Sequence, residues 1–200
     1  AIRHPQEGSA RLAADMTPIP VINAGDGANQ HPTQALIDLF SIQKCQNRIE
    51  GLHIGIAGDL KFGRTVHSLC QALGFYGVRL YFISPESLML PDSIHSELRK
   101  KGIKFSFHSS LHEVMEKLDI LYMTRIQKER FDSEFFENPC KLTMRHLEKV
   151  KPHFRILHPL PRVDEIERAI DSTPFAYYFN QAEHGTLIRS VLLALMLGKL

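Results

Sequence analysis

Residues 52–157 alternate between short apolar runs and amphipathic runs, and this alternation restricts the fold more than any other feature of the sequence. Five runs have the length and the β-branched or aromatic content of buried strands: 52–60, 78–83, 103–107, 120–124 and 155–157. Four helical patterns lie among them: 64–74, 93–101, 111–118 and 142–150. Strands that alternate with helices form parallel sheets. We therefore predict an α/β fold with a doubly wound parallel sheet, whose ligands bind at the carboxyl ends of the strands.

Composition argues against several classes of function. The 200 residues are 44% hydrophobic and 23% charged, as in ordinary globular proteins, and the net charge of +2 indicates neither a nucleic-acid nor a membrane partner. The longest apolar run, 191–197, is too short to span a bilayer. The three cysteines, Cys45, Cys70 and Cys140, are far apart and indicate neither disulfides nor a metal site. A reducing, cytoplasmic location is expected.

The segment 21–40, VINAGDGANQHPTQALIDLF, contains the strongest candidate for a binding site. Residues 21–22 are expected to form a short strand and 23–30 a polar loop. Pro32 suits the first turn of the helix that follows. His31 and Gln34 would then lie at a helix N-terminus, where unpaired N–H groups and the helix dipole attract anions. On chemistry alone, an ordinary loop with a surface histidine is an equal alternative.

Three further polar motifs follow predicted strands. They are GDLKFGRT at 58–65, YMTRIQKER at 122–130 and HPLPRVDE at 158–165. The first lacks the G-x-G-x-x-G pattern of dinucleotide-binding loops. Arg64 begins a predicted helix, where a guanidinium suits a bidentate carboxylate contact. Arg125 and Gln127 are two positions apart and face the same side of an extended chain, although Arg125 paired with Glu129 at a strand end is the alternative.

These motifs, in this order, resemble the signatures of the aspartate/ornithine carbamoyltransferase family. The matching segments are RHP at 3–5, GDGANQHPTQALIDLF at 25–40, the three motifs above, and YYFNQAEHG at 177–185. The resemblance covers nearly the whole chain. It implies transfer of the carbamoyl group of carbamoyl phosphate to an amine, an early step of pyrimidine biosynthesis where the amine is L-aspartate, without a cofactor, metal or covalent intermediate.

The resemblance also implies a role for each motif in holding carbamoyl phosphate. Arg3, otherwise an ordinary terminal charge, and His31 would bind the carbonyl oxygen and stabilise the charge that develops on it. Gln34 would hold the carbamoyl NH₂ group. A cis peptide bond between Leu160 and Pro161 would direct the Leu160 carbonyl into the site. Burial and the helix N-terminus should keep His31 neutral.

Two features favour aspartate over ornithine as the amine. Ornithine members of the family carry a cysteine where Pro159 stands, and they lack the Arg125 and Gln127 pair. By resemblance, Arg64 binds the α-carboxylate of aspartate and Arg125 the β-carboxylate, with Gln127 positioning it. Residues 128–141, long and polar, are expected to form a mobile loop that closes over the site.

The same resemblance predicts the organisation of domains and subunits. Residues 1–46 would be the C-terminal part of a second α/β domain, which binds carbamoyl phosphate, with a linking helix. Residues 47–176 would be the aspartate-binding domain, and 177–200 a crossover helix that returns to the first domain. A homotrimer with active sites shared between subunits is implied, with or without a separate regulatory chain.

Two expected parts of the family pattern have no match in this sequence. The main phosphate-binding motif, S-x-R-T-R, is absent, as is the lysine-bearing loop that one subunit lends to the next. Because both lie upstream in the family and the sequence begins at Ala1, we expect a fragment that is inactive or nearly so by itself. Residues 186–197 have almost no polar face and are predicted to form a buried helix, which would need cover in such a fragment.

Three alternatives to this assignment remain. The first is a non-catalytic binding or regulatory module that kept the fold, although such a module has no use for the full set of polar site residues. The second is a nucleotide-binding oxidoreductase domain, which predicts a glycine fingerprint and a ribose-binding acid near Arg79, and the sequence has neither. The third is a carbamoyltransferase for another amine, such as ornithine, which relative affinity for the two amines would distinguish.

Overall fold

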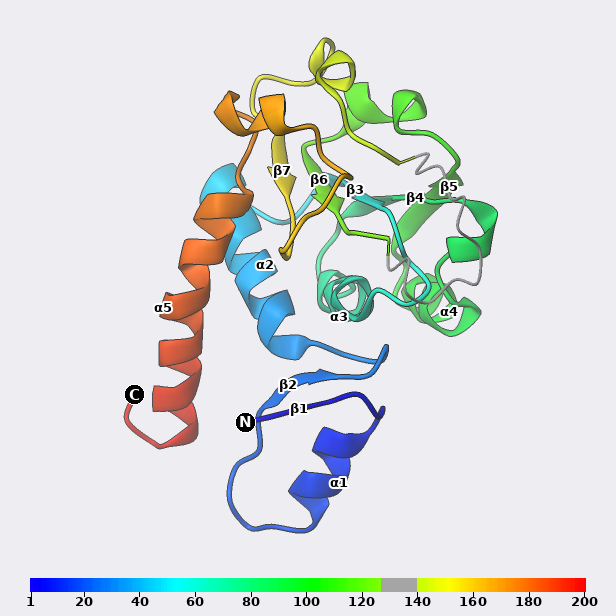
Figure 1. The fold of residues 1–200 in the computed structure, drawn as a ribbon. Coiled ribbons are helices and arrows are strands. Elements are labelled where there is room, and N and C mark those ends of the chain that lie inside the picture. The colour runs from blue at the N-terminus through cyan, green and yellow to red at the C-terminus, as the bar shows by residue number, and fades with distance from the viewer. Residues whose placement is uncertain (127–139) are drawn as a thin grey trace.

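The computed structural model describes residues 1–126 and 140–200, and its main feature is a sheet of five parallel strands (Figure 1). The strands are β3 (His53–Ala57), β4 (Arg79–Ile83), β5 (Lys104–His108), β6 (Ile120–Met123) and β7 (Arg155–Leu157). Their order across the sheet is β5-β4-β3-β6-β7, and every neighbouring pair is parallel. The chain therefore builds outward from β3 to β5 and then reverses to β6. The predicted doubly wound sheet is confirmed, with its switch point between β3 and β6.

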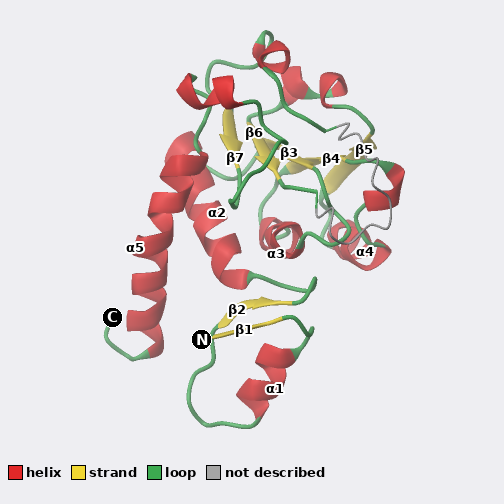
Figure 2. Cartoon of the chain, in the orientation of Figure 1, coloured by secondary structure: helices red, strands yellow, loops and turns green. Residues whose placement is uncertain are grey.

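Helices cover one face of this sheet (Figure 2). They are α2 (Pro32–Gln46), α3 (Arg64–Leu73) and α4 (Asp92–Lys100), the last preceded by the short turn η1 (Glu86–Leu88). Their apolar side chains form one core cluster with β3 and β4, which includes Ile54, Leu69 and Phe82. The boundaries lie within a residue or two of those predicted.

The other face is covered mainly by 3₁₀ turns, and here two predicted helices are wrong. In place of helices at 111–118 and 142–150 the chain forms η2 (Leu111–Glu113), η3 (Met115–Lys117) and η5 (Met144–Leu147), with η6 (Arg168–Ser172) beyond β7. Val114 has φ −130°, which ends the first helical turn. Leu142 forms a β-bridge with Ile166 instead, so its backbone is extended. Tertiary pairing has overridden a helical pattern in the sequence.

A separate two-stranded sheet lies beside α2. It pairs β1 (Ile2–His4) in parallel with β2 (Asn23–Asp26), and α1 (Ser9–Asp15) connects the two strands. The predicted strand at 21–22 is therefore misplaced, because the strand occupies part of what was expected to be the polar loop. Its polar residues have local partners: the Asp26 carboxylate accepts hydrogen bonds from Gly8 N and from the side chains of Asn23 and Asn29.

Helix α5 (Tyr178–Met196) runs beside α2 and begins eight residues before the predicted start at 186 (Figure 1). Its buried residues are Tyr178, Gln181 and Gly185, all in its first half. In its second half Leu193 is 51% and Leu195 is 61% exposed, so this part is not buried within the 200 residues, in line with the expectation that its apolar face would need cover. Among the described residues, no helix has both the length and the apolar content needed to cross a membrane.

The carboxyl ends of β3 and β6 approach each other closely at Gly58. This residue has φ +116°, and a Cβ atom there would lie less than 3.0 Å from the Thr124 carbonyl oxygen. Thr124 N donates to the Ala57 carbonyl at 2.9 Å, and Asp59 N donates to Thr124 Oγ1 at 3.1 Å. Only glycine permits both the backbone angle and the contact.

Replacing Gly58 with alanine should lower the free energy of unfolding by about 3 kcal/mol, because a clash adds to the cost of a positive φ. Gly51→Ala is the matched control, since Gly51 has φ +72° and an added Cβ atom would meet nothing within 4 Å. The control should lose only about 1–2 kcal/mol. Urea unfolding measures both values, and equal losses would show that the approach of β3 to β6 tolerates a side chain.

Candidate active site

A cavity of about 410 Å³ opens at the carboxyl ends of β3, β6 and β7. Its walls come from β1, the β2–α2 loop, the start of α2, the loops after the three strands, and α5. Seven of the eight site residues predicted from the sequence line it: Arg3, His31, Gln34, Arg64, Arg125, Leu160 and Pro161. The eighth, Gln127, lies outside the described residues, as does most of the loop predicted at 128–141. Segments more than 150 residues apart in the sequence therefore meet in one cavity.

Positive charge dominates this cavity. Four arginines line it, Arg3, Arg64, Arg125 and Arg189, whereas no Asp or Glu is among its described lining residues. Arg3 and Arg189 are exposed, and Arg64 and Arg125 are partly buried. Guanidinium groups form bidentate hydrogen bonds with carboxylates and phosphates. The cavity thus suits a ligand with several negative charges.

His31 is the N-cap residue of α2 and faces this charge. Its backbone N–H donates to Ser68 Oγ at 2.7 Å, and its Nδ1 lies 3.2 Å from Thr33 Oγ1. Burial lowers the pKa of His31 to about 4, with further lowering by Arg64, Arg3 and Arg189. The imidazole is therefore neutral near pH 7, as predicted, and the neighbouring arginines add to the effect of burial on its pKa, a contribution that the prediction did not include.

Arg64 is held at the start of α3 against the loop after β2. Its Nη1 donates to the Gly27 carbonyl at 3.2 Å. The guanidinium also lies over Gly25, where a Cβ atom would be 2.9 Å from Cζ. Gly25 thus leaves room for the Arg64 guanidinium, and the Gly27 carbonyl accepts its hydrogen bond, so the end of β2 and the start of α3 form one wall of the cavity.

The turn 158–161 is fixed from behind by buried groups. The Leu160–Pro161 peptide bond is cis, as predicted. Leu160 N donates to His158 Nδ1 at 2.8 Å, and His158 Nε2 lies 2.6 Å from Glu165 Oε1. The side chains of His158 and Glu165 are each 1% exposed. Burial alone would raise the pKa of Glu165, but the hydrogen bond with His158 and those from backbone N–H groups hold it below its usual value.

Gln34 occupies the first turn of α2 and is only 8% exposed. Its Nε2 donates to Asp38 Oδ1 at 2.8 Å, one helical turn further on. The amide therefore lies between the cavity and a buried carboxylate.

Arg189 lines the cavity although no sequence motif pointed to it. A signal was present: Gln181, Gly185 and Arg189 are spaced four apart, so they share one face of a helix. That face is the one that packs toward α2, since Gln181 and Gly185 are buried. Only the position of α5 beside α2 shows that the arginine reaches the site.

Comparison with known proteins identifies both parts of the chain. The carbamoyl-P binding domain of aspartate/ornithine carbamoyltransferase matches residues 1–44, and the Asp/Orn binding domain matches residues 50–196. The chain is 54% identical over 199 residues to aspartate carbamoyltransferase catalytic subunit 2 of Shewanella halifaxensis, and 53% identical to the catalytic subunit of Chromobacterium violaceum. These alignments cover 98% and 99% of the chain but only 64% and 67% of the relatives.

Solved structures agree with this result. The catalytic subunit of M. jannaschii aspartate transcarbamoylase superposes with a TM-score of 0.90 and 46% identity, over 98% of this chain and 65% of that one. The Trypanosoma cruzi aspartate transcarbamoylase in complex with N-(phosphonacetyl)-L-aspartic acid gives 0.86 and 36%, over 96% and 62%. The resemblance found in the sequence is confirmed, and the chain belongs to the aspartate/ornithine carbamoyltransferase family.

Proposed function

We propose that this chain provides the aspartate-binding part, and a portion of the carbamoyl-phosphate-binding part, of an enzyme that converts carbamoyl phosphate and L-aspartate to N-carbamoyl-L-aspartate and phosphate. The observation that carries the proposal is the cavity in which four arginines and a neutral histidine meet without an acidic side chain among the described lining residues. The two proposed substrates, L-aspartate and carbamoyl phosphate, together carry two carboxylates and a phosphate. The names of the relatives favour aspartate as the amine.

Carbamoyl phosphate binds beside the N-terminus of α2 in this proposal. Arg3 and neutral His31 donate to its carbonyl oxygen, and they stabilise the negative charge that grows there during attack. Such a donor is worth about 3–4 kcal/mol in the transition state. If the Thr33 hydroxyl donates to Nδ1, the ring proton is on Nε2 and can face the substrate. Gln34 and the Leu160 carbonyl hold the carbamoyl NH₂ group.

Aspartate binds on the side of the cavity formed by the loops after β3 and β6. Arg64 binds its α-carboxylate, and Arg125, with Gln127, binds its β-carboxylate. Two bidentate contacts fix the direction from which the amine approaches the carbamoyl carbon, and this orientation is itself a large part of catalysis. The amine nitrogen forms the new C–N bond, the C–O bond to phosphate breaks, and the departing phosphate takes the amine proton.

The wider organisation is also a proposal. Residues 1–46, 47–176 and 177–200 act as the edge of the carbamoyl-phosphate domain, the aspartate domain and the crossover helix. The complete site forms in a cytoplasmic homotrimer, where neighbouring subunits share residues, and the 200 residues alone have little or no activity because the S-x-R-T-R segment is not among them.

Titration with N-(phosphonacetyl)-L-aspartate tests the proposed function. Calorimetry would compare the 200-residue chain with a version extended by the S-x-R-T-R-containing segment of a relative. Tight binding by the extended version, with formation of N-carbamoyl-L-aspartate, is the expected result. Absence of binding by both versions would contradict the function and favour a non-catalytic module.

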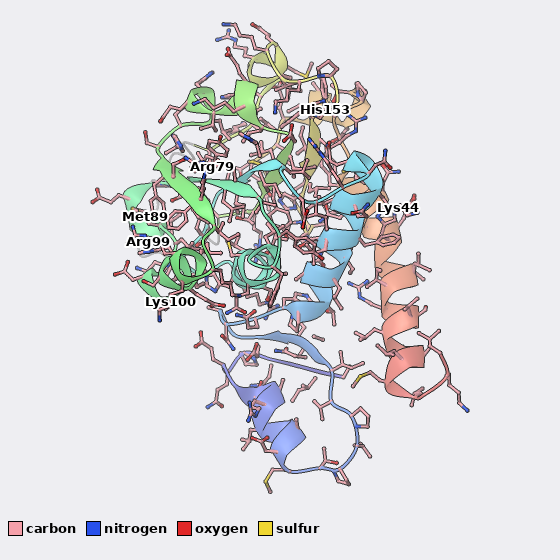
Figure 3. All side chains as sticks on the ribbon, turned by 180° about the vertical axis from the view of Figure 1, so that it is seen from behind. Lys44, Arg79, Met89, Arg99, Lys100 and His153 are labelled. Atoms are coloured by element: carbon pink, nitrogen blue, oxygen red, sulfur yellow. The ribbon has the colours of Figure 1, made fainter. Side chains whose placement is uncertain are left out.

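Replacing Arg125 with alanine in the active, full-length protein should raise KM for aspartate about 100-fold, because a bidentate contact between a partly buried guanidinium and the substrate carboxylate is lost. The dissociation constant for carbamoyl phosphate should change less than about threefold, since that ligand lies on the other side of the cavity. Lys100→Ala is the control: Lys100 is exposed on the outer side of α4, as Figure 3 shows from behind. If Arg125→Ala weakened the binding of aspartate and of carbamoyl phosphate equally, the role assigned to Arg125 would be refuted.

The low pKa of His31 predicts a dependence of stability on pH. The unfolded chain takes up a proton at His31 near pH 6.5, whereas the folded chain does so only near pH 4. The unfolded state therefore binds more protons in this window, and stability contributed by neutral His31 falls as the pH falls from 6.5 to 4. His31→Gln should reduce the slope of unfolding free energy against pH by up to about 1.4 kcal/mol per pH unit.

Urea unfolding at several pH values between about 4 and 7 measures this slope. His112→Gln, at an exposed histidine outside the cavity, controls for the loss of a histidine elsewhere. A slope unchanged by His31→Gln would mean that the imidazole is not kept neutral by the fold.

A further inference from the structure

Asp38 is a fully buried carboxylate on α2 that the proposed reaction does not use. It is 0% exposed and lies outside the lining of the cavity. Three neutral side chains donate to it: Gln34 Nε2 at 2.8 Å and Gln181 Nε2 at 2.6 Å, both to Oδ1, and the Tyr122 hydroxyl at 2.9 Å to Oδ2. A buried charge is expensive unless every lone pair has a partner. The group therefore joins α2, β6 and α5 at one point.

This arrangement determines which end of the Gln34 amide faces the cavity. Asp38 Oδ1 only accepts hydrogen bonds, so the amide must turn its NH₂ group toward it. The amide carbonyl, Oε1, is then the end left for the cavity that Gln34 lines. A flipped amide would place two acceptor oxygens against each other. The carboxylate thus makes Gln34 a hydrogen-bond acceptor toward a ligand.

The orientation persists when Asp38 takes up a proton. Burial raises the pKa of Asp38 to about 7, although hydrogen bonds from Gln34, Gln181 and Tyr122 oppose the rise. The proton is accommodated on Oδ2, because the Tyr122 hydroxyl can accept as well as donate. Oδ1 then continues to accept from both glutamine amides. Tyr122 on β6 is a titratable side chain in contact with this carboxylate, and the pKa of its hydroxyl is itself raised by burial, by Asp38 and by Cys70 on α3.

Gln181 connects Asp38 to the turn at residues 158–161, which forms another wall of the cavity. Its Nε2 donates to Asp38, and its Oε1 accepts from the His158 backbone N–H at 2.8 Å. His158 in turn accepts from Leu160 N. A second cavity of about 140 Å³ is bounded by Gln34, Gln181, His158 and Leu160, so these groups surround a shared space. The amide of Gln34 and the turn at Leu160 are therefore oriented by one buried oxygen.

We infer that Asp38 is a positioning residue that makes the site select a carbamoyl NH₂ group: it holds Gln34 so that Oε1 accepts from that group. This inference rests on the proposed function. A ligand such as acetyl phosphate, which has a methyl group in place of NH₂, cannot donate to Oε1 and leaves it without a partner. A site built around a hydrogen bond rejects analogues that lack it.

The test compares the dissociation constants of carbamoyl phosphate and acetyl phosphate, measured by calorimetry on the full-length protein. Asp38→Ala removes the acceptor without adding volume at this buried position, and Asp38→Leu, which is larger, is the second apolar variant if the alanine variant fails to fold. The preference for carbamoyl phosphate should fall about tenfold, the value of one net hydrogen bond. Asp38→Asn should keep the preference, because its Oδ1 still accepts from both glutamines.

Tyr122→Phe is the matched control within the same buried group. It removes the donor to Oδ2 but leaves both amides on Oδ1, so it should lower stability without changing the preference. The inference would be overturned if a folded Asp38→Leu or Asp38→Ala protein kept the same preference for carbamoyl phosphate over acetyl phosphate. Equal increases in the dissociation constants of both ligands would also overturn it. A wild-type protein that binds carbamoyl phosphate no better than inorganic phosphate and forms no N-carbamoyl-L-aspartate would instead refute the proposed function, and this role with it.

Discussion

The parallel pairing of β3 with β6 is the constraint on which the rest of the site depends. The chain reverses its direction across the sheet at this pair, so the loops that follow the two strands diverge and leave a crevice between them. Gly58 and Thr124 keep the two strand ends in contact. Arg64 and Arg125 follow these ends directly, and both line the cavity. The positions of Arg64 and Arg125, two of the four arginines in the cavity, therefore follow from the order of the strands in the sheet.

The other walls are brought to this crevice by helix packing. Helix α2 presents His31 and Gln34 at its N-terminus, and α5 lies along α2 with Arg189 on the inner side. Four guanidinium groups around one cavity repel one another, and two of them remain exposed to water. Anionic ligands relieve that repulsion, whereas a protonated imidazole would add to it. The same arginines, together with burial, lower the pKa of His31.

Most of the sheet and most of the site could be predicted from the sequence, because the information is local. The strands of the five-stranded sheet are short, largely apolar runs, and the motifs after β3, β6 and β7 supply Arg64, Arg125, Leu160 and Pro161. The failures have a common cause in tertiary contacts. Leu142 pairs with 165–167 instead of starting a helix. The polar residues of β2 form hydrogen bonds with one another, and α5 packs mainly against α2, which leaves part of its apolar surface exposed. Asp38 accepts hydrogen bonds from Tyr122 and Gln181, which are 84 and 143 positions away in sequence. Arg189 shares the cavity with Arg3 and His31, and its helical spacing alone does not show this.

Two of the buried carboxylates, Asp38 and Glu165, lie close to the arginine-rich cavity but do not neutralise it. Asp38 and Glu165 lie outside the cavity lining, behind Gln34 and His158, which do line it. Burial by itself would raise the pKa of both acids. Glu165 remains below its usual pKa because backbone N–H groups and His158 donate to it, whereas Asp38, with three neutral side-chain donors, has a pKa of about 7. In both cases a buried carboxyl group orients a polar side chain at the cavity wall. An acid placed in the wall itself would instead compete with an anionic ligand for the arginines.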